Sequence, residues 1–400
     1  MNNPLIFLNG QSNFSLLGFG KENELILNSS DSIDLIDEFI KKNKDQYIFC
    51  ALSFELKNRF ENLQSTNFDG VNFPELILFT TKNIVKIENN EFQFLKGEYH
   101  SENIQFVHNF LKEINSSSST EKNTIDFQFR ISKYEYLKNI EKLKKHIHLG
   151  DIYETNFCQE IFAENCELKD PLKTYSKINK VSQAPFSVYL SFNEFEIMGG
   201  SPERFIKKVD NKIISQPIKG TAKRGLTLKE DQKLIENLQN DPKERSENVM
   251  IVDLVRNDLS RIAKKGTVNV DELCKIYSFE TVHQMISTIS CDIEESTPFS
   301  KILEATFPMG SMTGVPKIKA LELTNQYESF NRGLYSGSIG YISPNGDFDL
   351  NVVIRTIIYN KERKYLSCGV GSAITNRSIA QNEYEECLIK IQKIIDAVNK

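Results

Sequence analysis

Short extended segments joined by tight polar turns are the feature that most constrains how this chain can fold. Residues 186–200 (FSVYLSFNEFEIMGG) predict two strands about an Asn-Glu turn, and residues 204–218 (RFIKKVDNKIISQPI) predict a hairpin about Asp210 and Asn211. Residues 333–374 have the pattern of a β-meander with a Pro-Asn-Gly-Asp turn. Strands joined this closely pair antiparallel, so much of the chain predicts antiparallel sheet.

Helices are indicated by their end signals. One is expected from Ser132, a suitable N-cap, to Gly150, which ends it. A second is expected from the cap Asp241 to Gly266, and a third covers about residues 378–399, with apolar side chains at helical spacing. Together with the strands, these helices predict an α/β protein.

Composition excludes several kinds of partner. The net charge of -5 over 400 residues gives no reason to expect nucleic acid or an anionic membrane surface. No apolar stretch reaches the roughly 18 residues of a membrane helix, and MNNPLIFLNG lacks the basic region of a signal peptide. The seven cysteines are scattered without a CxxC pair, which predicts neither a disulfide framework nor a zinc site. We therefore expect a cytoplasmic protein.

The clearest linker is NSSSSTEKN at residues 115–123, which is polar and without periodicity. We place a boundary there, between a β-rich N-terminal part of the fold (residues 1–120) and a region with candidate chemistry (residues 121–400). A surface loop inside one domain is the equal alternative.

The segment SPERFIKKVDNKIISQPIKGTAKRG holds two candidate catalytic side chains. Glu203 precedes one strand of the predicted hairpin and Lys219 follows its partner, so the two could meet at one end of the hairpin. Lys219 lies between an apolar residue and Gly220 in PIKGT, and we interpret it as a nucleophile.

Two expected helices each carry a pair of glutamates three residues apart, which places each pair on one helix face. The pairs are Glu244 with Glu247 and Glu383 with Glu386. A small number of carboxylate oxygen ligands is typical of a Mg²⁺ site. The alternative is that carboxylates near a helix N-terminus only complement the helix dipole, worth roughly 0.3–1 kcal/mol each.

Three further features are open to two interpretations. Arg355 interrupts the apolar strand pattern VVIRTII, so it either pairs with an acidic side chain or binds an anionic ligand. The Gly/Ser/Thr segment before the helix expected at Pro316 is either an anion site or an ordinary loop. His283, a single histidine on an expected apolar helix, would ordinarily be structural. Dinucleotide, P-loop and serine-hydrolase motifs are absent from the sequence.

The sequence resembles the chorismate-utilising enzymes over roughly residues 130–400, and more loosely before them. The resemblance rests on eight blocks in order: GDIYETNFCQ, GGSPERF, PIKGTAKRG, SENVMIVDLVRNDLSRI, VHQMIS, FPMGSMTGVPKIKA, SGSIGYISPNGDFDLNVVIRT and GVGSAITNRSIAQNEYEE. It implies the fold of anthranilate synthase component I, in which two antiparallel sheets pack face to face with helices outside.

Within the family, PIKGT resembles the para-aminobenzoate branch, component I of aminodeoxychorismate synthase, whereas anthranilate synthases normally have alanine in place of Lys219. The resemblance implies that this aminotransferase-type enzyme converts chorismate and ammonia to 4-amino-4-deoxychorismate on the folate pathway. Lys219 would attack C2 of chorismate and Glu203 would protonate the leaving C4 hydroxyl. The amine must be neutral, and we expect Lys223, Arg224 and the metal to help lower its pKa from ~10.4 toward about 7–8.

The same resemblance implies the remaining site. Mg²⁺ would be held by Glu247 and Glu386, supported by Glu244 and Glu383, and His283 would lie beside the C4 hydroxyl. The enolpyruvyl carboxylate and neighbouring groups of chorismate would contact Arg355, Tyr341, Thr221, Gly220, Gly369, Val370 and Gly371. No glutaminase nucleophile is present in the sequence, so ammonia would come from a separate glutamine amidotransferase subunit.

One position departs from the family pattern. Glu154 stands where this branch usually has glutamine and where isochorismate synthases have a lysine base. The absence of that lysine argues against an isochorismate synthase, which adds water to chorismate. The glutamate leaves open a small change close to the ring of the substrate. The sequence also lacks the tryptophan site of anthranilate synthases. Anthranilate synthase and a non-catalytic chorismate-binding paralogue remain the alternatives.

Overall fold

A computed structural model describes the chain except for residues 1–2, 11–13, 62, 90, 117–122 and 400. The expected boundary between residues 120 and 121 falls in this gap, outside the described residues. On either side of it, strands from the first 120 residues pair with strands from the rest: β1 (Leu5–Asn9) with β8 (Phe186–Phe192), and β3 (Ile48–Leu52) with β16 (Ser338–Ile342). The two parts therefore share their sheets.

The named strands form two antiparallel layers that are continuous through the long β4. The first layer runs in the order β7 (Glu154–Ala163), β19 (Tyr365–Thr375), β18 (Thr356–Asn360), β9 (Phe195–Ser201), β8, β1, β2 (Ser15–Leu27), β4 (Leu76–Glu88) and β5 (Glu91–Lys96). The second runs β3, β16, β17 (Phe348–Asn351), β10 (Arg204–Val209), β11 (Lys212–Gln216) and β14 (Val282–Asp292). β12 (Ile218–Lys223) and β13 (Asn269–Ser278) pair with β14, and the short β6 (Gln128–Phe129) and β15 (Gly314–Val315) pair with β7.

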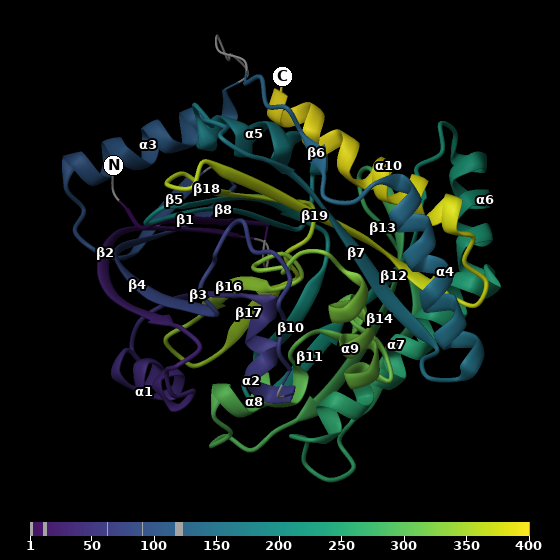
Figure 1. Cartoon of the computed structure of the whole chain (residues 1–400). Coiled ribbons are helices and arrows are strands. Elements are labelled where there is room, and N and C mark those ends of the chain that lie inside the picture. Colours follow the sequence, from purple (N-terminus) through teal and green to yellow (C-terminus); the bar gives the residue numbers. More distant parts are fainter. Residues whose placement is uncertain (1–2, 11–13, 62, 90, 117–122, 400) are drawn as a thin grey trace.

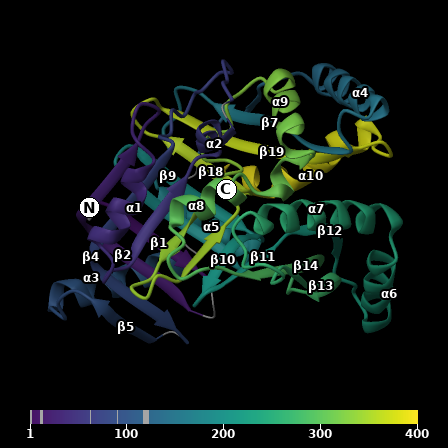
Figure 2. The same ribbon diagram turned by 90° about the horizontal axis from the view of Figure 1, so that it is seen from below.

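The helices lie outside the layers (Figure 1). They are α1 (Asp34–Lys42), α2 (Lys57–Glu61), α3 (Ser101–Asn115), α4 (Lys133–Leu149), α5 (Pro171–Ser182), α6 (Leu228–Gln239), α7 (Pro242–Ser260), α8 (Phe299–Thr306), α9 (Lys317–Tyr327) and α10 (Ala380–Asn399). Helices α3, α5 and α10 cover the first layer, and α6 and α7 cover β12–β14 (Figures 1 and 2). The expected face-to-face fold is confirmed.

Side chains alternate between two cores along the strands, as the strand period requires. In β1, Ile6 and Leu8 join the larger core, while Phe7 faces the other way and joins the core beneath α3, α4, α5 and α10. Residues on both faces of β1 are therefore apolar.

Most local predictions hold. Ser132 and Glu135 form a capping box on α4, which ends at Gly150 in the left-handed conformation. Asp241 caps α7, and Asp210 adopts φ 52° in the hairpin turn. The end expected for α7 is wrong: the helix stops at Ser260 rather than near Gly266, because Leu259 already lies in the core and the chain turns back toward β13.

No helix in the described part of the chain is long and apolar enough to span a membrane.

Candidate active site

An ion pair between Glu154 and Lys219 joins the two layers. Glu154 begins β7 in the first layer, and Lys219 lies in β12, which pairs with β14 of the second. Lys219 Nζ lies 2.6 Å from Glu154 Oε1, and the two side chains are only 10% and 1% exposed. In Figure 2 this end of the molecule shows β7, β19 and α10 opposite α7 and β12. We therefore take this junction between β7 and β12 as the candidate site.

An irregularity in β12 fits this strand to the helix beside it. Its pairing with β14 shifts register between Ile218 and Thr221, and Gly220 adopts φ 82°. A Cβ built on Gly220 would lie 3.1 Å from Oε2 of Glu244 at the start of α7. A side chain at Gly220 would thus be both strained and crowded, so glycine lets the Lys219 strand approach the acidic helix.

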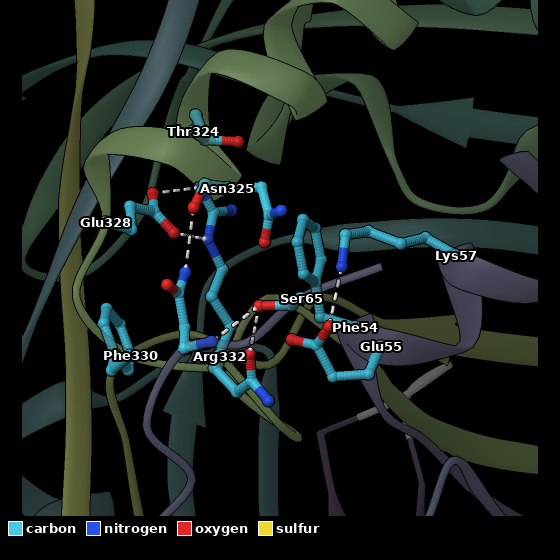
Figure 3. Close-up of a pocket in the computed structure, with 11 residues that line it drawn as sticks. Phe54, Glu55, Lys57, Ser65, Thr324, Asn325, Glu328, Phe330 and Arg332 are labelled. Atoms are coloured by element: carbon cyan, nitrogen blue, oxygen red, sulfur yellow. Dashed lines mark hydrogen bonds and ion pairs between the residues drawn. The ribbon is translucent and has the colours of Figure 1, made fainter. Parts of the chain in front are cut away.

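A buried arginine, drawn with its partner Glu328 in Figure 3, anchors the Glu154 strand from the other side. Arg332 makes a bidentate ion pair with Glu328, at 2.6 and 2.9 Å, and Glu328 also accepts a hydrogen bond from the amide of Cys158 in β7. Nη2 of Arg332 donates to the carbonyl of Asn156, two residues after Glu154, and Nη1 donates to that of Met312. The arginine therefore joins β7 to the loop of residues 307–315.

Glu203 lies in the same site, as expected from the hairpin. Its carboxylate accepts hydrogen bonds from the amide of Ile218 and the hydroxyl of Ser311, and Lys219 and Arg355 act on it electrostatically. Burial outweighs these contacts and raises the pKa of Glu203 to about 7. A carboxylic acid with this pKa can donate a proton near neutral pH.

The chain's own charges oppose the expected lowering of the Lys219 pKa. Burial favours the neutral amine, but Glu154, Glu247 and Glu203 together hold the pKa of Lys219 above its ordinary value. Arg224, expected to press on the lysine, is instead paired with Asp231 at 2.8 Å. The resting side chain is therefore an ammonium.

The two glutamate pairs are on α7 and α10, and one lysine lies between the helices. Lys243 Nζ lies 3.8 Å from Glu247 Oε1 and 3.4 Å from Glu383 Oε1. Glu386 pairs with Lys390 at 2.7 Å. Burial raises the pKa of Glu247 to about 7, although Lys219 and Lys243 oppose the shift. The carboxylates of α7 and α10 are thus paired with the ammonium groups of Lys243 and Lys390, which reduce their mutual repulsion.

The donor set suits a hard divalent cation. Glu247 is nearly fully buried, and its Oε1 has no hydrogen-bond partner in the structure. An anionic oxygen without a hydrogen bond is costly unless a cation compensates it. Within the described residues, however, no three acidic, histidine or cysteine side chains converge closely enough to hold a metal ion. The carboxylates fit Mg²⁺ by chemistry and are not gathered around a single point.

His283 is placed in a strand, so the expected apolar helix around it is wrong. It lies in β14 with no exposed surface. Its Nδ1 lies 2.8 Å from Ser278 Oγ, and its Nε2 lies 2.8 Å from Asp231 Oδ1. Through its contacts with Ser278 and Asp231, His283 joins β13 and α6 to β14. Its expected place beside the C4 hydroxyl stays a prediction.

Arg355 lies at a bend rather than within a strand. The first part of the apolar run, residues 352–354, follows β17 outside any strand, the last part begins β18, and Arg355 between them adopts φ 52°. Burial lowers its pKa, and Glu203 opposes that shift. Of the two interpretations of this charge, an acidic neighbour is thus observed, and the anionic ligand stays a prediction.

The other expected substrate contacts lie on three strands. Thr221 follows Gly220 in β12, whereas Tyr341 lies in β16 with its ring centroid 5.9 Å from that of Tyr47. The last three residues, Gly369, Val370 and Gly371, lie in β19 and pair with β7. Among the described strands, β18 pairs with β19 only as far as Ser367. The second edge of residues 369–371 therefore pairs with no described strand, and contact of the amides there with a ligand stays a prediction.

Three residues of the site were missed from the sequence: Lys243, Ser311 and Arg332. Lys243 stands four residues before Glu247, a spacing that brings side chains together on a helix, so this pairing had a local signal. Ser311 acts on Glu203 across a long separation and had none. Arg332 pairs with Glu328 four residues before it, but its contacts with Asn156 and Met312 span long separations and had no local signal.

The chain belongs to the chorismate binding enzyme family, whose model matches residues 3–396. It is 36% identical over 277 residues to aminodeoxychorismate synthase component 1 of Escherichia coli, covering 69% of this chain and 60% of that protein. It is also 36% identical over 286 residues to anthranilate synthase component 1 of Acetivibrio thermocellus, covering 71% and 57%. The chain thus spans less than two thirds of the length of these relatives.

Solved structures share the fold. Anthranilate synthase component I from Streptococcus pneumoniae superposes with a TM-score of 0.81 at 23% identity, covering 96% of this chain and 92% of that one. The menaquinone-specific isochorismate synthase of Escherichia coli gives 0.75 at 18% identity, covering 99% and 89%.

Proposed function

We propose that the protein is a component I of aminodeoxychorismate synthase, which converts chorismate and ammonia to 4-amino-4-deoxychorismate for para-aminobenzoate and folate synthesis. The observation that carries the proposal is the presence of Lys219 and Glu203 in one buried site, where they interact electrostatically and Glu203 has a pKa raised to about 7. The 36% identity to a relative with this name supports it.

In the proposed reaction Lys219 acts as the nucleophile and Glu203 as the acid. The neutral amine forms a bond to C2 of chorismate, the two ring double bonds each move one position, and the C4–O bond breaks. Glu203 protonates the departing hydroxyl, which leaves as water. Ammonia then adds at C4, the double bonds move back, and the C2–N bond breaks to release Lys219. Glu203 takes back a proton from the new ammonium group, so chorismate and ammonia yield product and water.

The remaining residues bind and orient chorismate. Glu247 and Glu386, with Glu244 and Glu383 beside them, would hold Mg²⁺, which would neutralise and orient the ring carboxylate. Arg355 would bind the enolpyruvyl carboxylate, together with Tyr341 and the amides of residues 369–371. Thr221 and Gly220 would contact the ligand near Lys219, and His283 would act near the C4 hydroxyl.

The ammonia would come from a separate glutamine amidotransferase subunit. Free ammonium at high concentration would serve in the absence of that partner.

Anthranilate synthase component I is the second candidate. A relative with this name is equally similar, at 36% identity, and the reaction would yield anthranilate and pyruvate. The lysine at position 219 argues against it. A chorismate-binding paralogue without turnover would bind the same ligand, but the presence of Glu203, Lys219, Glu247 and Glu386 together argues against that reading.

The identity of the product tests these candidates. The protein is incubated with chorismate, Mg²⁺ and ammonium, with and without a glutaminase subunit and glutamine, and the products are identified by mass spectrometry. We expect 4-amino-4-deoxychorismate. Anthranilate would establish the second candidate, and chorismate left unconsumed in both mixtures would establish the paralogue.

A further inference from the structure

Glu154 is the acidic group in contact with the candidate nucleophile. Its Oε1 lies 2.6 Å from Nζ of Lys219, within charge-assisted hydrogen-bond distance. The other charged groups that act on Lys219 belong to different elements: Glu203 before β10, Glu244 and Glu247 of α7, and Glu386 of α10. Within the described residues, Glu154 is the one of these five for which a direct contact with Lys219 is observed.

The surroundings of Glu154 leave it free to hold a proton. Its second oxygen, Oε2, is buried and has no hydrogen-bond partner in the structure. Its backbone is fixed by pairing with Val315 of β15 and Thr375 of β19. The carboxylate is thus held against Lys219 while half of its hydrogen-bonding capacity is unused.

Because the pair is buried, transfer of a proton from Lys219 to Glu154 is more favourable in free energy than loss of that proton to water. Both charged partners pay a desolvation cost, which grows when a substrate displaces the remaining water. Transfer from Nζ to the carboxylate converts an ammonium and a carboxylate into an amine and a carboxylic acid, so both charges disappear without any ion leaving the site.

We propose that Glu154 is the proton acceptor of Lys219 and generates its nucleophilic amine. This inference rests on the proposed covalent role of Lys219. The N–H bond of the ammonium breaks as an O–H bond forms on Glu154, and the freed electron pair of Nζ forms the bond to C2 of chorismate. When ammonia later expels Lys219, the amine takes its proton back from Glu154, so the pair returns to its resting charge state.

The test follows covalent attachment of chorismate to Lys219 in the full chain. Wild type and Glu154→Gln are mixed with chorismate and Mg²⁺ without ammonia, and the adduct is quantified over time by intact-protein and peptide mass spectrometry. Glutamine can accept a hydrogen bond but not a proton at this pH. Between about pH 5.5 and 7, we expect a nearly constant rate for wild type and a rate that falls about tenfold per pH unit on acidification for Glu154→Gln.

The controls separate this effect from misfolding and from weak binding. Glu164→Gln removes the same charge from an exposed position just after β7 and should match wild type. Thermal melting should show a cooperative transition for Glu154→Gln, which establishes that the variant is folded, and equilibrium dialysis should give a chorismate affinity close to that of wild type. Lys219→Ala should form no adduct at this position.

Three outcomes are decisive. A rate of adduct formation that falls on acidification in Glu154→Gln but not in wild type supports the inference. Equal rates and equal pH profiles, or faster attachment in Glu154→Gln near pH ~6, would overturn it while leaving the covalent route intact. If wild type forms no adduct at any pH but still converts chorismate with ammonia, the covalent role of Lys219 fails, and the inference fails with it.

Discussion

Glu154 and Lys219 are 65 residues apart in the sequence, and their side chains meet at 2.6 Å. The contact joins the two sheet layers. It also brings Glu154, where the sequence resemblance predicts a glutamine, onto the candidate nucleophile. The site is therefore shaped by closure of the fold at this junction, and four predictions test its parts.

Lys219→Ala should abolish formation of 4-amino-4-deoxychorismate, by about 10³-fold or more, because the nucleophile is lost. Chorismate binding should be retained, since the carboxylate-binding groups stay in place. Steady-state turnover with ammonium and equilibrium dialysis with chorismate measure the two effects. Unchanged turnover in this variant would rule out the covalent route.

Glu203 should impose a loss of activity as the pH rises. Burial raises its pKa to about 7, so the acid is protonated below that pH and becomes a carboxylate above it. As a general acid it must carry the proton, and the rate of adduct formation should decline as pH increases through about 7. Glu203→Gln should lose roughly 10²-fold or more and show no such decline. A wild-type rate that stays constant well above this pH would contradict the assignment.

Lys243→Met should change how the protein binds Mg²⁺. Lys243 Nζ lies 3.4 Å from Glu383 and 3.8 Å from Glu247, so it competes with a metal ion for these carboxylates. We expect Mg²⁺ to bind about three- to tenfold more tightly in titration calorimetry. In EDTA the melting temperature should fall, because the carboxylates repel one another without the lysine.

Two controls accompany this variant. Lys243→Arg keeps the charge and should keep the wild-type affinity, and Lys301→Met removes an exposed lysine of α8 that pairs with Glu304. Weaker Mg²⁺ binding in Lys243→Met would show that the lysine assists the metal rather than competing with it.

Arg332→Met should destabilise the protein by about 3–5 kcal/mol, because it leaves the buried Glu328 without its partner. The arginine also donates to the carbonyls of Asn156 and Met312, so both sides of the site lose an anchor. Urea unfolding measures the change. Glu328→Gln added to Arg332→Met should recover part of the loss, whereas equal stability of the single and double variants would place the arginine's contribution elsewhere.

Local patterns predicted much of the fold. The hairpin about Asp210, the capped start of α7 at Asp241 and the end of α4 at Gly150 all follow from interactions within a few residues. The end of α7 and the strand around His283 were missed, because packing against β13 and β14 overrides local preference there.

The sequence by itself determined many of the elements, several of their turns and the chemical groups that each carries, because these depend on neighbours along the chain. It also placed Glu203 and Lys219 at one end of a hairpin. Only the tertiary structure decided that Glu154 pairs with Lys219 and that Lys243 links Glu247 to Glu383 across α7 and α10. The pairing of Glu154 with Lys219 depends on how the two sheet layers and their covering helices pack against each other. The separation of the two residues along the chain does not predict that packing.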